Sequence, residues 1–222
     1  MITLLMPTRS RFYEASNTIS SFFEMAKNKD NIEFIIRCDS DDKEFLLKLT
    51  ELPYFERIKV IIGNRYSGYY DLHLFYNEML KLSTGNFIMP INDDLICETK
   101  NYDELILSKS VDDIKIYTGI NKGNYQGWYF PIINKKILDE IGHLSKCVFY
   151  DGYLYFSLKE LGIYEDINLK FTHYQLKDKL SEDKDVVLKT INSGDKKHLD
   201  YFKNDMDANK IKIKNILKKN NE

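Results

Sequence analysis

The chain has 222 residues, of which 43% are hydrophobic and 30% charged, a composition typical of a soluble globular domain with one sizeable core. Its formal net charge of −2 argues against a protein whose main partner is a nucleic acid, because such proteins usually carry a basic excess. The three cysteines form no CxxC pair and no zinc-binding spacing, so unpaired thiols in a reducing cytoplasm are expected. The first apolar run is too short for a signal peptide, and no window reaches the ~18 apolar residues that span a bilayer.

Short apolar runs alternate with amphipathic segments over the first 95 residues. Buried strands are predicted at 2–6, 32–37, 58–62 and 86–90. Apolar residues at spacings of three and four predict helices over 12–26 and 72–82, with a short helix at 46–49 and Gly85 as the C-cap of the second long helix. This alternation predicts a doubly wound parallel sheet, in which ligands bind at the carboxyl ends of the strands.

Beyond residue 110 the pattern is less regular. Further strands are predicted at 114–118, 128–133 and 169–172, with a polar loop over 119–127. Asn134 and Gly142 are expected to cap a helix between them, and Leu154, Leu158 and Leu161 mark another. From about Lys177 the chain is polar and rich in lysine, and we expect one or two solvated helices there.

Polar side chains follow three of the predicted strands. The strand tips read Pro7-Thr8-Arg9-Ser10-Arg11, Arg37-Cys38-Asp39-Ser40-Asp41-Asp42 and Asn92-Asp93-Asp94. In a doubly wound sheet these tips converge on one cleft. The guanidinium fork of arginine matches phosphate oxygens, and neighbouring carboxylates suit a hard metal ion that bridges the same phosphates. The tips therefore predict a site for a diphosphate and a divalent cation.

These residues resemble the GT-A glycosyltransferases, close to the large family-2 group. The matching elements are Pro7-Thr8-Arg9, Asp39, the run from Asn77 through Thr84-Gly85 to Asp94, and Phe130-Pro131-Ile132-Ile133 followed by Gly142 and Asp151. The resemblance covers roughly residues 1–175. It implies an α/β fold, a single Rossmann-like GT-A domain whose mostly parallel central sheet has helices on both faces. It also divides the chain into a domain at 1–176, with a nucleotide-binding half at 1–95 and an acceptor half at 96–176, and a charged helical tail at 177–222.

The activity that this resemblance implies is metal-dependent transfer of a sugar from a nucleotide diphosphate sugar to a hydroxyl of a glycan, a lipid-linked or a protein acceptor. Asp151 matches the general base of inverting members, Asp94 and His173 match ligands of Mn²⁺ or Mg²⁺, and Trp128 lies where the family lines its acceptor site. The nucleotide-binding residues that it implies are Pro7, Thr8, Arg9, Arg37, Asp39, Arg65, Asn77, Asn92 and Asp93.

Several of these residues have a second interpretation. Asp151 can instead be an acid stabilised at a helix N-terminus, and one of Ser40, Asp41 or Asp42 is expected to cap a helix. His173 and Trp128 can be structural, and Arg11 has even claims to phosphate binding and to solvent.

Literal Asp-x-Asp strings elsewhere carry little weight as metal motifs. Asn92-Asp93-Asp94 alone combines a preceding apolar strand with a preceding amphipathic helix. The strings that begin at Asp183 and Asp205 follow no buried strand and are expected to be solvated charge.

Two other functions stay open, a nucleotidyltransferase and a non-catalytic sugar- or nucleotide-binding protein of the same fold. A nucleotidyltransferase usually has a glycine-rich loop after its first strand, and Pro7-Thr8-Arg9-Ser10-Arg11 contains no glycine. In the tail, lysines alternate with isoleucines over 210–217. Such a basic amphipathic end can rest on an anionic membrane, although a terminal helix packed on the domain is the favoured interpretation.

Overall fold

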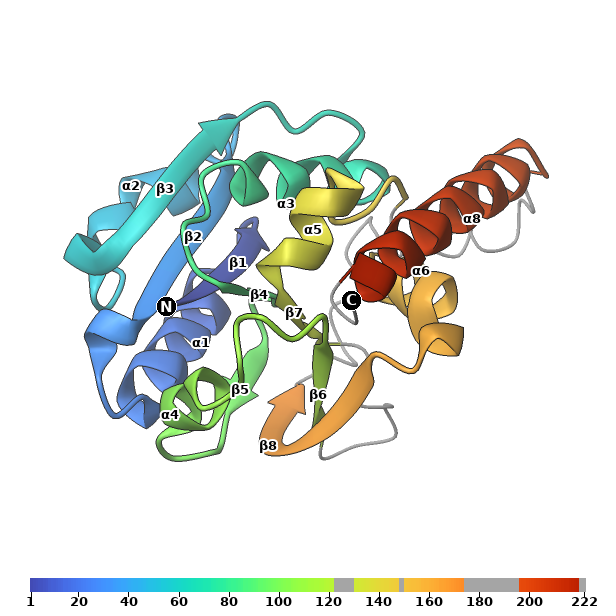
Figure 1. Cartoon of the computed structure of the whole chain (residues 1–222). Coiled ribbons are helices and arrows are strands. Elements are labelled where there is room, and N and C mark those ends of the chain that lie inside the picture. Colours follow the sequence, from blue (N-terminus) through green and yellow to red (C-terminus); the bar gives the residue numbers. More distant parts are fainter. Residues whose placement is uncertain (122–129, 148–149, 174–195, 220–222) are drawn as a thin grey trace.

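The computed structural model describes residues 1–121, 130–147, 150–173 and 196–219, and a mixed sheet lies at its centre (Figure 1). The strands are β1 Ile2–Thr8, β2 Ile32–Asp39, β3 Ile58–Gly63, β4 Phe87–Pro90, β5 Leu95–Cys97, β6 Ile116–Asn121, β7 Ile132–Asn134 and β8 Tyr164–His173. They form one eight-stranded sheet in the order β3-β2-β1-β4-β7-β6-β8-β5.

The half of the sheet from β3 to β4 is parallel, as the sequence predicts. All residues of β2 and β4, and nearly all of β1, are buried, because strands of a parallel sheet are covered on both faces. The carboxyl ends of β1, β2 and β4 therefore lie at the same edge of the sheet, and their polar tips meet there.

Helices cover both faces of the sheet. They are α1 Phe12–Met25, α2 Lys43–Leu47, α3 Leu72–Leu80, α4 Tyr102–Leu107, α5 Lys135–Ile141, α6 Tyr150–Leu158 and α8 Lys196–Lys219. Leu4 and Met6 of β1 belong to the apolar cluster with α1, α2 and α4, whereas Leu5 belongs to the cluster with α3, α5, α6 and α8. Alternate residues of one strand thus point to opposite layers, which confirms the predicted arrangement.

The second half of the sheet contains antiparallel pairs. β7 pairs antiparallel with both β4 and β6, and β5 pairs antiparallel with β8. Neither β5 nor α4 was predicted, β7 begins four residues later than expected, and β6 continues through Gly119 into the predicted polar loop. The Asn134 side chain accepts a hydrogen bond from the amide of Lys136, and Gly142 has φ of 90°, so both predicted caps of α5 are confirmed.

The predicted role of Gly85 as a helix cap is wrong. α3 ends at Leu80, and Gly85 lies against β1, where its amide donates to Oγ1 of Thr3. A Cβ atom at Gly85 would come within 2.6 Å of that oxygen and 2.8 Å of the carbonyl oxygen of Met1. Close approach to the backbone of β1, rather than helix termination, is what requires glycine here.

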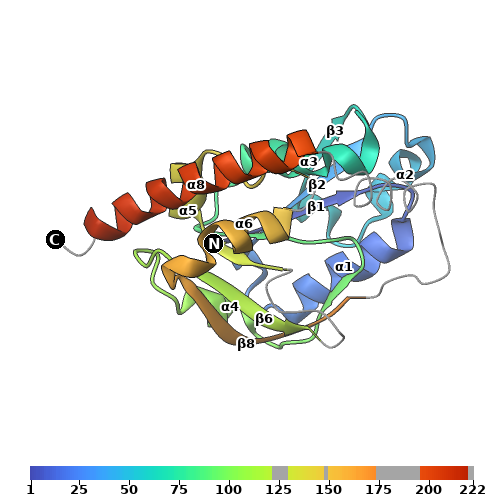
Figure 2. The same ribbon diagram turned by 90° about the vertical axis from the view of Figure 1, so that its right-hand side faces the viewer.

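The C-terminal helix is part of the fold. Figure 2 shows α8 running over α5 and α6, with its C-terminal end reaching beyond them. Ile213 is fully buried, and Met206, Ile216 and Leu217 pack against the same apolar cluster. This agrees with the favoured prediction of a helix packed on the domain. No helix in the described part of the chain is long and apolar enough to cross a membrane.

Candidate functional site

The loop after β1 meets the turn after β4 through charged side chains. The Arg11 guanidinium donates to Oδ1 of Asp93 at 2.6 Å and to Oδ2 of Asp94 at 2.7 Å. Oγ1 of Thr8 donates to the other oxygen of Asp93 at 2.8 Å. These contacts follow from the parallel pairing of β1 with β4, which places the two tips side by side. Arg11 thus bridges the paired aspartates.

The two neighbouring aspartates have different electrostatic environments. Burial raises the pKa of Asp93 to about 7, although the Arg11 charge and the Thr8 hydroxyl oppose the shift. Burial would also raise the pKa of Asp94, but contacts with His173 and Arg11 outweigh it and lower that pKa. At neutral pH, therefore, Asp94 is the fully ionised member of the pair.

His173, at the end of β8, lies beside Asp94. β5 begins at Leu95 and pairs antiparallel with β8, in a register that puts Leu95 opposite His173. Nε2 of His173 lies 2.8 Å from Oδ1 of Asp94 and 3.4 Å from Nδ2 of Asn92. The Phe130 ring packs edge-on against the imidazole, with ring centroids 5.3 Å apart. The structure thus brings the two predicted metal ligands together.

The donor atoms of Asp94 and His173 suit one divalent cation. Ligands held about 2.1 Å from an octahedral ion lie about 3 Å from each other, close to the separation of these two atoms. Among the residues that the structure describes, no group of three or more His, Cys, Asp or Glu side chains could hold a metal.

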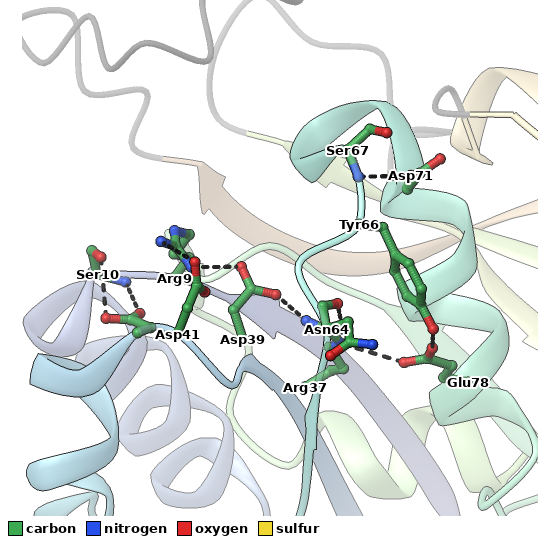
Figure 3. Close-up of polar contacts among 11 residues, drawn as sticks. Arg9, Ser10, Arg37, Asp39, Asp41, Asn64, Tyr66, Ser67, Asp71 and Glu78 are labelled. Carbon is green, nitrogen blue, oxygen red and sulfur yellow. Dashed lines mark hydrogen bonds and ion pairs between the residues drawn. The ribbon is translucent and has the colours of Figure 1, made fainter.

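Asp39, at the end of β2, is paired with two arginines (Figure 3). Nη1 of Arg9 lies 3.0 Å from Oδ2 of Asp39 and also donates to Asp41 at 2.5 Å. The Arg9 contact lowers the pKa of Asp41, with a smaller contribution from the charge of Arg65. Arg37 binds the other oxygen of Asp39 and is itself buried. It therefore presents no atom to a ligand, whereas Arg9 remains partly exposed.

Asp42 supplies the helix cap predicted for one residue of the β2 tip. Its side chain accepts a hydrogen bond from the amide of Phe45 at the start of α2. It also accepts from the amide of Ser10 at 2.5 Å, which joins the loop after β1 to α2. Ser10 has φ of 53°, a conformation that L side chains rarely adopt. Arg9 and Arg11 flank this constrained residue.

Three other predicted nucleotide-binding residues, Pro7, Arg65 and Asn77, have local contacts of their own. Pro7 is half-buried in β1 and pairs in register with Arg37. Arg65 follows β3 and packs over Gly68, where a Cβ atom would lie 3.4 Å from its Nε. Both ends of the Asn77 amide are bound to backbone, the oxygen by the amide of Leu144 and the nitrogen to the carbonyl of Ser145. These bonds join α3 to the segment after α5.

Two predicted site residues concern the general base and the acceptor site. Trp128 lies outside the described residues. Asp151 is the second residue of α6, as the prediction of an acid at a helix start requires, but its side chain is also outside the description. The assignments of the general base and of the acceptor site stay predictions.

The sequence also left residues of this region unassigned. For Arg11 the sequence does not decide between phosphate binding and solvent exposure, although Arg11 shares with Arg9 its place in the loop after β1. Glu78 is not assigned from the sequence, and it contacts both Arg37 and the Tyr66 hydroxyl. Its spacing gives no signal, because these contacts join α3, β2 and the loop after β3.

No protein-family model and no curated protein matches the chain. Among solved structures, it is similar to the mannosyltransferase PcManGT from Pyrobaculum calidifontis in complex with GDP-Man and Mn²⁺, with a TM-score of 0.61 and 11% identity over 80% of this chain and 57% of that one. It is also similar to residues 1–349 of S. aureus TarS in complex with UDP-GlcNAc, with a TM-score of 0.57 and 12% identity over 78% of this chain and 59% of that one.

A third similar structure is the same TarS fragment in complex with UDP, with a TM-score of 0.60 and 12% identity over 77% of this chain and 59% of that one. The chain spans less than two thirds of the length of these proteins. At such identities the likeness concerns the fold. Together with the sheet order described above, it shows that the chain has a GT-A-like α/β fold, which it shares with these structures.

Proposed function

We propose that the chain transfers a sugar from a nucleotide diphosphate sugar to an acceptor hydroxyl, with inversion at the anomeric carbon. The observation that carries this proposal is the pair formed by Asp94 and His173, which lies beside Arg11 at the carboxyl edge of the sheet. A diphosphate carries several negative charges, and this edge offers cationic side chains together with donor atoms for a metal.

The donor diphosphate would bind between the two arginines of the loop after β1. Arg9 is partly exposed and is held by Asp39 and Asp41, so it can exchange a carboxylate for a phosphate oxygen. Asp94 and His173 would hold Mn²⁺ or Mg²⁺, which supplies positive charge to the departing diphosphate. Arg11 keeps Asp94 oriented through its other oxygen, Oδ2.

The nucleoside would lie against the tips of β2 and β3. A carboxylate such as Asp39 accepts hydrogen bonds from ribose hydroxyls or from a base N–H. Arg65 and the loop Tyr66-Ser67-Gly68 follow the tip of β3 in the chain. Thr8, Asn92 and Asp93 would line the site next to the phosphates. Thr8 and Asp93 are hydrogen-bonded to each other there.

Asp151 would take the proton from the acceptor hydroxyl as that oxygen attacks the anomeric carbon. Trp128 would line the acceptor site, where a flat aromatic face suits a sugar ring. The acceptor is a glycan, a lipid-linked or a protein hydroxyl. The free thiols Cys38, Cys97 and Cys147 fit a reducing cytoplasm as the place of this activity.

Peripheral membrane contact through α8 is a separate proposal. Its exposed lysines Lys214, Lys218 and Lys219 are followed by no acidic residue within the described part of the helix. Removal of α8 would expose the apolar cluster, so charge reversal is the cleaner test. Flotation of the wild type with phosphatidylserine vesicles should fall in a variant with all three lysines changed to Glu, and equal flotation would contradict the contact.

A thermal-shift screen of nucleoside diphosphates and nucleotide sugars, with and without Mn²⁺, tests the main proposal. A ligand at 100 times its dissociation constant should add about 2.7 kcal/mol to the free energy of unfolding. The nucleotide sugar that stabilises the protein is then assayed for hydrolysis and transfer. Stabilisation by the donor with no turnover would favour the non-catalytic binder. Release of pyrophosphate from a nucleoside triphosphate and a sugar phosphate would favour the nucleotidyltransferase.

A further inference from the structure

The two carboxylate oxygens of Asp39 have unequal partners. Oδ1 accepts from Nη1 of Arg37, whose side chain is 1% exposed. Oδ2 accepts from Arg9, whose side chain is 30% exposed and is shared with Asp41. Arg9 can leave Asp39 at little cost, because it is partly exposed, and Asp41, water or a ligand can then satisfy its guanidinium. Oδ2 is therefore the oxygen that a ligand can reach, and Oδ1 is permanently occupied.

The Arg37 guanidinium is enclosed on every side that the structure describes. Its central carbon lies 4.0 Å from the centroid of the Phe75 ring, within the range of a cation–π contact. Nη2 donates to the carbonyl oxygen of Asn64, and Nε lies 3.3 Å from a carboxylate oxygen of Glu78. A Cβ atom at Gly63 would come within 2.9 Å of Nη2. Glycine at the end of β3 thus leaves room for the buried fork.

Glu78 connects this fork to the loop after β3 (Figure 3). Its second carboxylate oxygen accepts from the Tyr66 hydroxyl at 3.1 Å, and the Tyr66 ring stacks on Phe75 with centroids 6.1 Å apart. Tyr66 has φ of 51°, a strained conformation for a tyrosine that these contacts hold in place. One carboxylate of α3 therefore orients both an arginine of β2 and an exposed aromatic ring.

We infer that Arg37 and Glu78 are a positioning pair: they fix Asp39 so that Oδ2 receives the nucleoside of the donor, and they hold Tyr66 beside it. The inference rests on the proposed function and adds to it the residues that set recognition of the nucleoside. Neither residue touches the ligand. Their effect is on the orientation of Asp39 and Tyr66, so it should appear in binding of the nucleoside and be absent from binding of the diphosphate.

A purely structural ion pair is the competing account. Buried ion pairs are often replaceable without loss of stability, so conservation of the fold would not separate the two. The separating measurement is affinity for two probes. UDP and GDP carry a nucleoside, whereas pyrophosphate carries only the phosphates, and each is titrated calorimetrically in the presence of Mn²⁺.

Glu78→Gln is the first variant, because it keeps the side-chain shape and removes the charge that pairs with Arg37. We expect affinity for the nucleoside diphosphate that the wild type binds to fall about tenfold, the loss of one charge-assisted orientation, while pyrophosphate affinity is unchanged. Glu44→Gln, at an exposed position on α2, is the control and should change neither. Unchanged binding of the nucleoside diphosphate, or an equal loss for pyrophosphate, would overturn the positioning role.

Gly63→Ala and Asp39→Asn complete the test. The alanine displaces the Arg37 fork without altering any charge, so it should reproduce the selective loss. In a background that combines Asp39→Asn with Tyr66→Phe, Glu78→Gln should cause no further loss, because its effect passes through those two side chains. Additive losses would overturn the pair while leaving the proposed function intact. If the wild type bound pyrophosphate but no nucleoside diphosphate of the thermal-shift screen, the proposed function itself would fail, and the inference with it.

Discussion

Nε2 of His173 lies 2.8 Å from Oδ1 of Asp94, a contact made by the antiparallel pairing of β5 with β8. The other oxygen of Asp94 is held by Arg11, so one carboxylate joins the last described strand of the sheet to the loop after the first. The contact leaves Asp94 ionised, since its pKa is lowered in spite of burial. An ionised carboxylate beside an imidazole is a donor set that a divalent cation can use.

Asp94→Ala should abolish the part of nucleoside diphosphate affinity that depends on Mn²⁺. The fold should survive, because Arg11 keeps its contact with Asp93. Calorimetric titration with and without Mn²⁺ measures the difference, and Asp113→Ala at an exposed position is the control. Full Mn²⁺-dependent affinity in Asp94→Ala would show that the metal is held elsewhere.

His143 should make stability depend on pH. Burial lowers its pKa to about 4, against the ordinary value of 6.5, and the charges of Lys146, Lys212 and His73 add to the shift while Asp205 opposes it. The folded state therefore disfavours the proton that the unfolded chain accepts. The stabilising contribution is complete above pH 6.5 and is lost as the pH falls toward 4.

The measurement is the free energy of unfolding of the wild type and of His143→Gln at pH 7.5 and pH 5. The wild type should lose about 2 kcal/mol more than the variant over this range, since glutamine does not titrate. The difference between the two proteins removes the contributions of groups whose titration does not depend on His143. Parallel losses would mean that His143 is protonated equally in both states.

The parallel half of the fold could be predicted because its signals are local. Ile2–Thr8 and Ile32–Asp39 are short segments rich in apolar residues, and the long helices between the strands show a clear period of three to four. β5 has only three residues and α4 only six, which is too short for a period to stand out. Their existence depends on pairing with β8 and on packing against α1, which no local pattern contains.

The candidate site was likewise predictable only where its signals are local. Polar residues near the ends of buried strands predicted a cluster that includes Asp39 and Asp94, because the ends of parallel strands share an edge, whereas the roles of the two residues came from the family resemblance. Side-chain contacts between different elements could not be predicted from the sequence, such as the contact between Glu78 of α3 and Arg37 of β2. Asp205 was wrongly expected to be solvated, because the sequence does not reveal which face of α8 packs on α6.

Asp205 should stabilise the attachment of α8. Its carboxylate, only 12% exposed, accepts from Tyr153 and Asn209 and forms an ion pair with Lys146 at 2.5 Å. Asp205→Asn should lower the free energy of unfolding by about 1–3 kcal/mol, the usual cost of disturbing a buried hydrogen-bonded group.

Asp207→Asn is the matched control, because Asp207 is exposed on the same helix and only two residues away. Its free energy of unfolding should stay within about 0.5 kcal/mol of the wild type. Amide hydrogen exchange should also rise over 203–219 in Asp205→Asn and not in Asp207→Asn. Equal stability of the two variants would show that the buried network does not hold the helix.

Asp151→Asn tests the catalytic proposal, because it keeps the side-chain size and removes the basic group. If Asp151 takes the proton from the acceptor, the rate of transfer should fall by roughly 10²–10⁴-fold, while affinity for the donor stays the same because the proposed donor contacts lie at Arg9, Asp39 and Asp94. If Asp151 is only an acid at the start of α6, the variant should remain active and lose about 0.3–1 kcal/mol of stability.

Glu104→Gln, in the first turn of α4, is the control: it combines a helix-start effect with loss of the ion pair between Glu104 and Lys27. The substrate for the assay is the nucleotide sugar that stabilises the wild type, with its hydrolysis by water as the reaction when no acceptor is known. Loss of turnover in Asp151→Asn but not in Glu104→Gln, with equal donor affinity in both, is the expected result. Transfer near the wild-type rate in Asp151→Asn would mean that another group is the base or that the reaction retains configuration.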